Sequence, residues 1–212
     1  MKYFFNLTLL LLLYPFLYGQ NIPDSSVLDI TAPEHFIFEF NTSKGKIEAE
    51  SYREWSPEGV DRVYQLIQSG FFDSTIIFRV QPEYVCQFGI SRFPEVNKFW
   101  NLHPLKDEPV VMSNVKGSMA FARGEPETRT TQLFFNMQDN PKLDTINFYG
   151  LAGFPIVAQI IEGDQALFQL ESKYGFEPAN WQDSISMKGN LFLDEKFPGL
   201  DYIIDAKIIE NK

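Results

Sequence analysis

Short apolar runs, each bounded by turn residues, constrain the fold of this chain more than any other feature. They recur at residues 76–80, 84–89, 117–122, 132–137, 155–161 and 200–209. Runs of this length that are rich in β-branched and aromatic residues are typical of strands. Since only two helical segments lie among them, they favour a closed barrel or a sandwich over a parallel α/β sheet. We therefore predict a fold dominated by β-structure.

The sequence ahead of these runs predicts a β-hairpin and a helix. Residues 35–41 and 46–51 alternate in hydrophobicity on either side of a short polar turn that ends in glycine, which is the pattern of a hairpin. Ser56 is an N-cap candidate followed by proline, and apolar residues then recur at helical spacing. This predicts a helix over residues 57–69. Residues 164–172 predict a second, shorter helix.

The N-terminal stretch differs from the rest of the chain. Lys2 supplies a positive charge, residues 7–13 are apolar apart from Thr8, and the stretch ends at Gly19. This is typical of a cleaved secretory signal peptide. A membrane anchor is the alternative, but the apolar run falls well short of the roughly 20 residues that span a bilayer. We expect a signal peptide at residues 1–19 and an exported protein, periplasmic or secreted, with no stable membrane association after cleavage.

The remaining chain divides into a linker and one domain. Residues 20–33 are polar, contain two prolines and show no sustained periodicity, which predicts a linker or mobile arm. Residues 34–212 are long enough to bury a hydrophobic core of their own, so we expect them to form a single domain.

Composition excludes several classes of function. The chain of 212 residues has 18 Lys and Arg against 28 Asp and Glu, a formal charge of -10. Such a charge repels a phosphate backbone, so no nucleic acid is expected as a partner. The single Cys forms no intrachain disulfide, and one Cys with two His does not make a zinc site of the usual kind. We expect the chemistry to come from other side chains, with no cofactor.

Arg79 lies inside an otherwise apolar strand, in the segment IIFRVQPEYVCQFG. Because strand residues alternate between faces, Ile76, Phe78 and Val80 are expected to face the core and Arg79 the opposite side. Gln87, in the next strand, places an amide where it shares a surface with Arg79. For Arg79 taken alone, the alternative is an exposed, ion-paired arginine.

A second segment places the amide of Gln132 beside the flat ring of Phe134. Its sequence is GSMAFARGEPETRTTQLFFN. Gln132 and Phe134 are two residues apart in a strand and share a face, although plain core packing is the simpler explanation for any one Phe. We expect Arg123 and Arg129 to form hydrogen bonds within loops or to face solvent. Cys86 is expected to be a small buried hydrophobe. A Cys/His hydrolase that uses one of the two histidines is a remote alternative.

These two segments resemble the signatures of the cyclophilin family of peptidyl-prolyl cis/trans isomerases. FRVQPEYVCQFG is similar to the family's Arg-bearing and Gln-bearing strands, and GSMAFARGEPETRTTQLFF is similar to its second signature. The likeness extends over residues 36–209, and two ordered signatures after a matching helix are far more specific than one short motif. The resemblance implies a closed eight-stranded antiparallel β-barrel capped by two α-helices, with a peptide groove on its outer surface.

The resemblance also implies roles for individual residues. Arg79 falls at the family's catalytic arginine, and Gln87 falls at the glutamine beside it, where it is expected to hold a substrate carbonyl. Ala122 and Arg123 occupy the segment that offers backbone hydrogen bonds to the substrate. The full set of implied substrate-binding residues is Tyr84, Val85, Gln87, Ala122, Arg123, Gln132, Phe134, Leu143 and Phe154.

Two positions depart from the family pattern. Lys142 stands where many members carry Trp, or another aromatic residue, that binds the drug cyclosporin, and Phe154 stands where many members have His. Cyclosporin binding is therefore doubtful, whereas the arginine and the inner pocket are retained. We expect a monomer.

The function expected from these features is isomerisation of X-Pro bonds in exported proteins during folding, with proline-containing polypeptides as substrates. One alternative is a cyclophilin-like peptide-binding or scaffold module with weak catalysis. Another is an unrelated secreted β-barrel that binds a small ligand, which fails if the groove residues do not converge in space.

Overall fold

The computed structural model of this chain describes residues 22–211. The predicted signal peptide and the first two residues of the predicted linker lie outside the described residues. Between residues 22 and 211, no helix combines the length and apolar character needed to cross a membrane.

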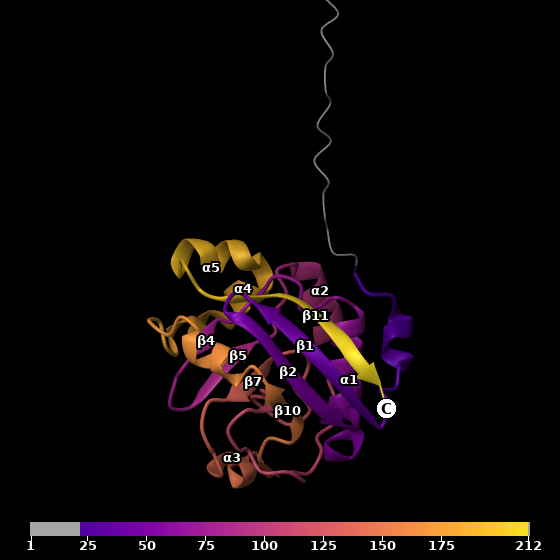
Figure 1. The fold of residues 1–212 in the computed structure, drawn as a ribbon. Coiled ribbons are helices and arrows are strands. Elements are labelled where there is room, and N and C mark those ends of the chain that lie inside the picture. The colour runs from indigo at the N-terminus through magenta and orange to yellow at the C-terminus, as the bar shows by residue number, and fades with distance from the viewer. Residues whose placement is uncertain (1–21, 212) are drawn as a thin grey trace, which may run out of the picture.

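The central element of the described chain is one curled antiparallel sheet (Figure 1). Its nine strands lie in the order β3-β11-β1-β2-β10-β6-β7-β5-β4. Their bounds are β1 His35–Thr42, β2 Gly45–Tyr52, β3 Thr75–Ile76, β4 Arg79–Val80, β5 Val85–Phe88, β6 Ser118–Phe121, β7 Leu133–Asn136, β10 Ile156–Glu162 and β11 Tyr202–Asn211. A separate ribbon pairs β8 (Asn147–Phe148) with β9 (Leu151–Ala152). The predicted β-dominated fold and its hairpin are confirmed.

The sheet differs from the closed eight-stranded barrel that was expected, because it has nine strands and its edge strands β3 and β4 do not pair with each other. The single strand predicted at residues 76–80 is two short strands, β3 and β4, which lie at opposite edges of the nine-stranded sheet. They are joined by Ile77, whose N–H donates to the Asp201 carbonyl (2.8 Å), and Phe78, whose N–H donates to the Gln87 carbonyl (3.1 Å). One bent segment therefore runs from one edge of the sheet to the other, and the bend divides the expected strand in two.

Aromatic side chains fill the inside of the curled sheet. Phe36, Phe38 and Phe40 alternate along β1 and are almost completely buried. The Phe40 ring meets the rings of Phe72 and Phe88 edge-on, with centroids 5.0 and 5.6 Å apart. Edge-on aromatic pairs add to the stabilisation from buried area. The alternation that predicts the hairpin therefore marks the core face of β1.

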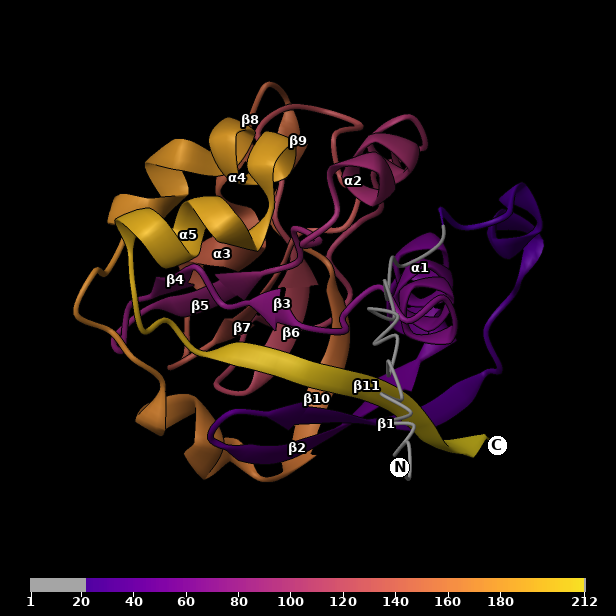
Figure 2. The same cartoon turned by 90° about the horizontal axis from the view of Figure 1, so that it is seen from above.

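Among the described residues there are five α-helices, where two were expected. α1 (Pro57–Gln68) and α2 (Pro94–Asn101) bury apolar side chains in the aromatic core, and α3 (Lys142–Thr145) is a single turn. α4 (Gln182–Lys188) and α5 (Asn190–Lys196) lie together beside β3 and β4 (Figure 2). There, Ile185 and Leu193 pack against Ile76 and Phe78 in a second apolar cluster. The helix predicted at residues 164–172 is a 3-10 helix, η3 (Asp164–Gln169).

The predicted helix at residues 57–69 is confirmed as α1, but its N-terminal cap differs. The Ser56 side chain accepts no hydrogen bond from a helix N–H group. Instead, the Glu108 carboxylate accepts from the N–H groups of Glu58 (2.8 Å) and Gly59 (3.1 Å), and the Ser56 hydroxyl donates to the same carboxylate. An acidic side chain from a distant loop therefore meets the positive end of the helix dipole.

Residues 22–33, the described part of the predicted linker, contain a segment packed against α1. Ser25–Asp29 form a 3-10 helix, η1, and the Val27 side chain in it is buried with 8% exposed. The Gln65 side-chain amide on α1 donates to the Ile30 carbonyl (2.9 Å). The interpretation of this stretch as a mobile arm is therefore corrected, because its backbone and side chains are bound to the domain.

Candidate active site

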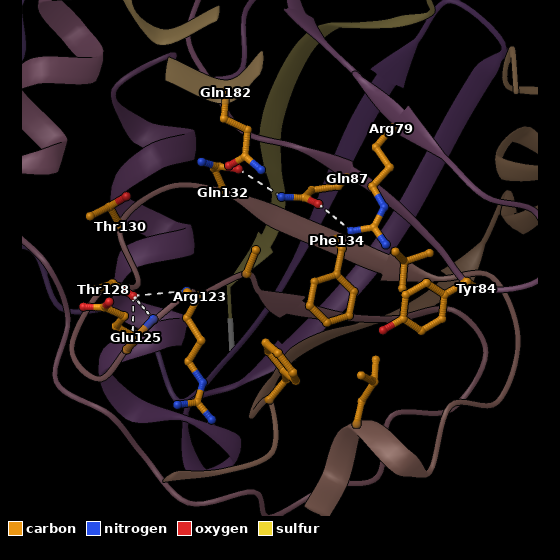
Figure 3. A pocket seen from close by; sticks show the side chains of 15 residues that line it. Arg79, Tyr84, Gln87, Arg123, Glu125, Thr128, Thr130, Gln132, Phe134 and Gln182 are labelled. Atoms are coloured by element: carbon orange, nitrogen blue, oxygen red, sulfur yellow. Dashed lines mark hydrogen bonds between the residues drawn. The ribbon is translucent and has the colours of Figure 1, made fainter. Parts of the chain in front are cut away.

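One pocket on the outer surface of the sheet brings together all ten residues that the sequence singled out (Figure 3). Its volume is about 390 Å³. It is lined by Arg79, Tyr84, Val85, Gln87, Ala122, Arg123, Gln132, Phe134, Leu143 and Phe154, and also by Gly124, Glu125, Thr128, Thr130 and Gln182. Residues from both sequence signatures and from the loops after them therefore share one concave surface.

The register of the strands explains why these side chains meet. Arg79 lies opposite Gln87 on the neighbouring strand, and Gln87 lies opposite Phe134. Ala120 is next in the row, opposite Phe134. Directly opposed residues of antiparallel strands project from the same face of the sheet. One row across β4, β5, β7 and β6 therefore presents a cation, an amide and an aromatic ring in order.

Arg79 reaches this outer face because the strand is interrupted just before it. Ile77 and Val80 pack in the aromatic core, whereas Ile76 and Phe78 pack in the cluster under α4 and α5. Simple alternation placed Ile76 and Phe78 in the barrel core, and that prediction is wrong. The interruption at Ile77 and Phe78 restarts the alternation, so Val80 faces the core and Arg79 faces outward, as predicted.

Amide side chains hold the Arg79 guanidinium in place. Arg79 Nε donates to Gln81 Oε1 (2.8 Å), and Nη1 donates to Gln87 Oε1 (3.1 Å). Gln87 Nε2 in turn donates to Gln132 Oε1 (2.9 Å). Within the part of the chain that the structure describes, Arg79 Nη2 has no hydrogen-bond acceptor. Gln87, which was expected to hold a substrate carbonyl, is instead engaged with Arg79 and Gln132.

The Arg79 side chain is partly buried and stays charged. Burial lowers the pKa of its guanidinium, and Tyr84 partly offsets this, but arginine remains protonated near neutral pH. No carboxylate among residues 22–211 forms an ion pair with it, so the alternative of an exposed, ion-paired arginine is wrong. The rings of Tyr84 and Phe176 lie 5.4 and 4.7 Å from the guanidinium carbon.

An apolar wall lies beside this cation (Figure 3). Val85, Phe134 and Leu143 are buried, with exposed fractions of 3%, 5% and 4%. Phe154 packs against the same cluster, and its ring meets that of Phe134 edge-on with centroids 5.6 Å apart. The wall offers a small apolar ring a place to bind within reach of a guanidinium.

Arg123 and Ala122 form another side of the pocket. Arg123 Nη2 donates to the Gly153 carbonyl (2.6 Å), and its guanidinium carbon lies 5.3 Å from the centre of the Phe154 ring. Arg123 therefore bonds a loop, as predicted. The Ala122 N–H donates to the Gln132 carbonyl (2.9 Å), so this N–H is not available to a bound peptide.

A buried polar network behind the pocket was not foreseen. The Asp144 carboxylate on α3 accepts from the Asn114 N–H (2.7 Å) and from Asn114 Nδ2 (2.8 Å). Asn136 Nδ2 donates to Asn114 Oδ1 (3.0 Å). Asn140 Nδ2 donates to Asn136 Oδ1 (2.8 Å) and to the Tyr84 carbonyl (2.9 Å). The network ties α3 to the strands that carry the pocket, and an asparagine at the end of an apolar strand was the only sequence signal for it.

Besides the lining residues of the loop after β6, sequence reasoning missed Phe176 and Gln182, which lie outside both signature segments. Gln182 lines the pocket, and Phe176 lies over Arg79. Both come from the segment that contains the 3-10 helix η4 (Glu177–Trp181) and the start of α4. No spacing rule links this segment to either signature, because only its packing on β3 and β4 brings it there.

The cysteine and the histidines lie outside this site. Cys86 is buried in the core as predicted, and burial raises the pKa of its thiol to about 12, so it is neutral near pH 7. His35 stacks on Tyr52 with ring centroids 4.2 Å apart, and His103 Nδ1 lies 2.8 Å from the Phe99 carbonyl oxygen. A Cys/His hydrolase is not supported. Across the described residues, no group of three or more His, Cys, Asp or Glu side chains is placed to hold a metal ion.

Comparison with known families gives this pocket its context. The family model described as "Cyclophilin type peptidyl-prolyl cis-trans isomerase/CLD" matches residues 37–188, well over half of the chain. The chain belongs to the cyclophilin family. It is therefore a peptidyl-prolyl cis-trans isomerase of cyclophilin type, and the interpretation as an unrelated ligand-binding barrel is wrong.

Individual relatives agree with this assignment. The cyclophilin is 29% identical over 130 residues to peptidyl-prolyl cis-trans isomerase B of Escherichia coli (strain K12), covering 58% of this chain and 77% of the relative. It is 32% identical over 127 residues to peptidyl-prolyl cis-trans isomerase cyp18 of Streptomyces antibioticus, covering 57% of this chain and 76% of the relative.

Solved structures show the same fold at lower identity. A cyclophilin-type peptidyl-prolyl cis-trans isomerase of Cryptosporidium parvum matches with a TM-score of 0.59 and 16% identity, over 84% of this chain and 99% of that one. A cyclophilin from Hirschia baltica matches with a TM-score of 0.57 and 12% identity, over 84% of this chain and 76% of that one. The Cryptosporidium parvum protein was also crystallised in the presence of the dipeptide Ala-Pro, and that structure matches with a TM-score of 0.53 and 16% identity, over 82% of this chain and 99% of that one.

Proposed function

We propose that this cyclophilin accelerates the cis/trans isomerisation of X-Pro bonds in exported polypeptides, with Arg79 as its catalytic residue. One observation carries the proposal. The Arg79 guanidinium is held through Nε and Nη1, while its Nη2 has no acceptor among the described residues and the guanidinium lies beside a buried apolar wall.

The chemistry of peptide-bond rotation calls for a fixed cation of this kind. Rotation faces a barrier of about 18 to 20 kcal/mol because the nitrogen lone pair is delocalised into the carbonyl group. In the twisted transition state the lone pair returns to the prolyl nitrogen, which then accepts a hydrogen bond that the planar ground state does not accept. A donor placed at that nitrogen stabilises the transition state more than the ground state, which is the condition for catalysis.

The other pocket residues bind the substrate, exclude water and orient Arg79. Val85, Phe134 and Leu143 bind the pyrrolidine ring and exclude water, which strengthens the contact between Arg79 and the nitrogen. Gln87 orients the guanidinium by accepting from Nη1. No covalent bond is made or broken, so the step needs no nucleophile and no general base. If Arg79 supplies about 3 kcal/mol, the rate rises roughly a hundredfold.

The cellular location of the enzyme and its polypeptide substrates are part of the same proposal. The positively charged start and the apolar run of residues 1–19 support export. Uncatalysed X-Pro isomerisation takes about 10 to 100 s at 25 °C, so newly exported chains are substrates for which a catalyst matters. The crystallisation of a structural relative in the presence of Ala-Pro supports proline-containing peptides as ligands.

Exchange NMR on a short Ala-Pro peptide tests the catalytic proposal, with the chain from residue 20 onward as enzyme. We expect catalysed exchange that falls roughly a hundredfold in Arg79→Ala. Arg92→Ala is the matched control, because Arg92 also lies over an aromatic ring, that of Phe93 at 4.7 Å, but does not line the pocket. Binding of the peptide without any change in its exchange rate would support the weakly catalytic peptide-binding module instead.

Export is tested separately from catalysis. The full chain is expressed in a cell with a secretory pathway, and the N-terminus of the recovered protein is read by mass spectrometry. We expect the exported protein to begin near Gln20. A protein that stays inside the cell and keeps Lys2 would contradict the proposed location and leave the catalytic proposal standing.

A further inference from the structure

Phe176 is an aromatic residue at the active site to which the sequence analysis assigned no role. Its ring centre lies 4.7 Å from the guanidinium carbon of Arg79. Phe176 is 48% exposed, so core packing does not account for its position. Tyr84 is a second ring against the same guanidinium, at 5.4 Å, and belongs to the pocket itself.

The backbone that carries Phe176 is well supported. The Ala179 N–H donates to the Phe176 carbonyl (2.9 Å), which fixes Phe176 at the start of η4. Ala179 is buried in the second apolar cluster together with Ile76 and Phe78. Phe78 directly precedes Arg79 in the chain. The segment that presents the Phe176 ring is therefore anchored on the same stretch of backbone that presents the guanidinium.

Within residues 22–211, hydrogen bonds hold only two of the three guanidinium nitrogen atoms of Arg79. Arg79 is held through Nε and Nη1 by two glutamine side chains, Gln81 and Gln87. Glutamine side chains have rotatable bonds of their own, and the Nη2 end of Arg79 has no acceptor among the described residues. An aromatic ring near the guanidinium attracts the cation electrostatically. The ring thereby limits how far the guanidinium can swing away from the pocket.

We propose that Phe176 is a positioning residue, which acts through Arg79 by holding its guanidinium in the orientation that presents Nη2 to the substrate. The inference rests on the proposed catalytic role of Arg79 and extends it to an element outside both signature segments. Because the ring acts on a group that is needed only in the transition state, its loss is felt in kcat more than in KM.

The chain offers a matched control for this contact. Phe168 is also an exposed aromatic residue under a cation, with 47% of its surface exposed and the Lys116 ammonium 4.4 Å from its ring centre. It lines a different hollow that shares no residue with the pocket of Arg79. Phe168→Leu therefore removes the same kind of contact at a place where the proposal expects no effect on catalysis.

The kinetic test compares Phe176→Leu, Phe176→Tyr and Phe168→Leu on the same Ala-Pro peptide. We expect kcat to fall about five- to tenfold in Phe176→Leu with little change in KM, and to recover in Phe176→Tyr, which restores an aromatic face. Phe168→Leu is expected to match the unmodified enzyme. A rise in KM with kcat unchanged, or no change in either constant, would overturn the proposal.

A second measurement follows Arg79 without using activity. The Nε–H resonance of Arg79 is recorded by 15N NMR in the unmodified protein, Phe176→Leu and Phe168→Leu. Loss of the Phe176 ring is expected to move this resonance and to speed its exchange with water, while Phe168→Leu leaves it unchanged. An unmoved resonance in Phe176→Leu would show that the ring does not hold Arg79. If the resonance moves but the unmodified protein has no activity, the proposed function fails and the contact stands.

Discussion

The three nitrogen atoms of the Arg79 guanidinium are used in different ways. Nε and Nη1 donate to glutamine oxygens at 2.8 and 3.1 Å, whereas Nη2 has no acceptor among the described residues. A lysine could not divide its contacts in this way, since all three of its donors sit on one nitrogen atom that rotates freely. The residue type at position 79 therefore follows from geometry as well as from charge.

Gln87 orients the Arg79 guanidinium, and its removal gives a prediction at this scale. In Gln87→Ala, Nη1 loses its acceptor and the guanidinium gains freedom, so we expect kcat/KM for an X-Pro peptide to fall about tenfold, which corresponds to about 1.4 kcal/mol. Gln159→Ala serves as control, because Gln159 is also an amide on a strand, donates to the Lys116 carbonyl (3.2 Å) and does not line the pocket. Equal activity in both variants would mean that Gln87 does not orient Arg79.

At the scale of secondary-structure elements, the pocket depends on how α3 is tied to the sheet. Leu143, one of the apolar wall residues, is followed directly by Asp144, whose carboxylate accepts from both nitrogen atoms of Asn114. Burial raises the pKa of this carboxyl, but hydrogen bonds from Ser113 and Asn114 outweigh that effect and hold it below its usual value. The ionised form is therefore favoured in the folded protein.

The pKa of Asp144 predicts how stability depends on pH. A carboxyl whose pKa is lowered in the folded state stabilises the fold above its unfolded pKa, near 4, and loses this contribution as the pH falls through the lower folded value. Asp144→Asn should therefore cost about 1 to 2 kcal/mol of unfolding free energy at pH 7. The gap between the variant and the unmodified protein should close as the pH falls below about 4.

Urea unfolding at several pH values measures this gap. Asp164→Asn is the control, since Asp164 is an exposed carboxylate paired with Lys116 at 3.4 Å and exposed surface pairs contribute little. A constant difference between Asp144→Asn and the unmodified protein from pH 7 to pH 3 would contradict the assignment, because it would not depend on ionisation of the carboxyl.

The sequence predicted well those elements whose burial or ending shows in the local pattern of residues. The alternation of Phe36, Phe38 and Phe40 marks the core face of β1, and Gly70, at a φ of 65°, ends the run that forms α1. The strand at Arg79 was harder to predict because its interruption depends on β11 and β5 binding it from two sides. The cap of α1 was missed for the same reason, since Glu108 is distant in sequence from Ser56.

The candidate site likewise contains residues that strand spacing predicts and residues that it does not. The spacing of Gln132 and Phe134 in one strand, and of Tyr84, Val85 and Gln87 in another, placed the inner pocket correctly because strand periodicity sets which residues share a face. The segment of Phe176 could not be placed, because α4 and α5 reach β4 only through a second apolar cluster. Their helical pattern was itself divided by Gly189, whose φ is 65°.

At the scale of the whole molecule, the chain ahead of the barrel is part of the folded unit. Val27 is buried against the core, and the Gln65 amide is satisfied by the Leu28 and Ile30 carbonyls at 3.2 and 2.9 Å. Asp61 on α1 also accepts from the Ala32 N–H (2.9 Å). Removing this segment would expose apolar surface and leave the buried Gln65 amide and the partly buried Asp61 carboxylate with fewer partners.

Truncation therefore gives the last prediction. A chain that begins at Glu34 should be less stable than one that begins at Ile22 by about 2 to 4 kcal/mol, from the loss of one buried valine and several hydrogen bonds. For a domain of this size that corresponds to a melting temperature lower by about 4 to 16 °C. Activity on a short peptide at low temperature should be equal in the two chains, because no residue of this segment lines the pocket. Equal melting temperatures in calorimetry would show that the segment does not stabilise the domain and that the linker extends to Pro33, as the sequence predicted.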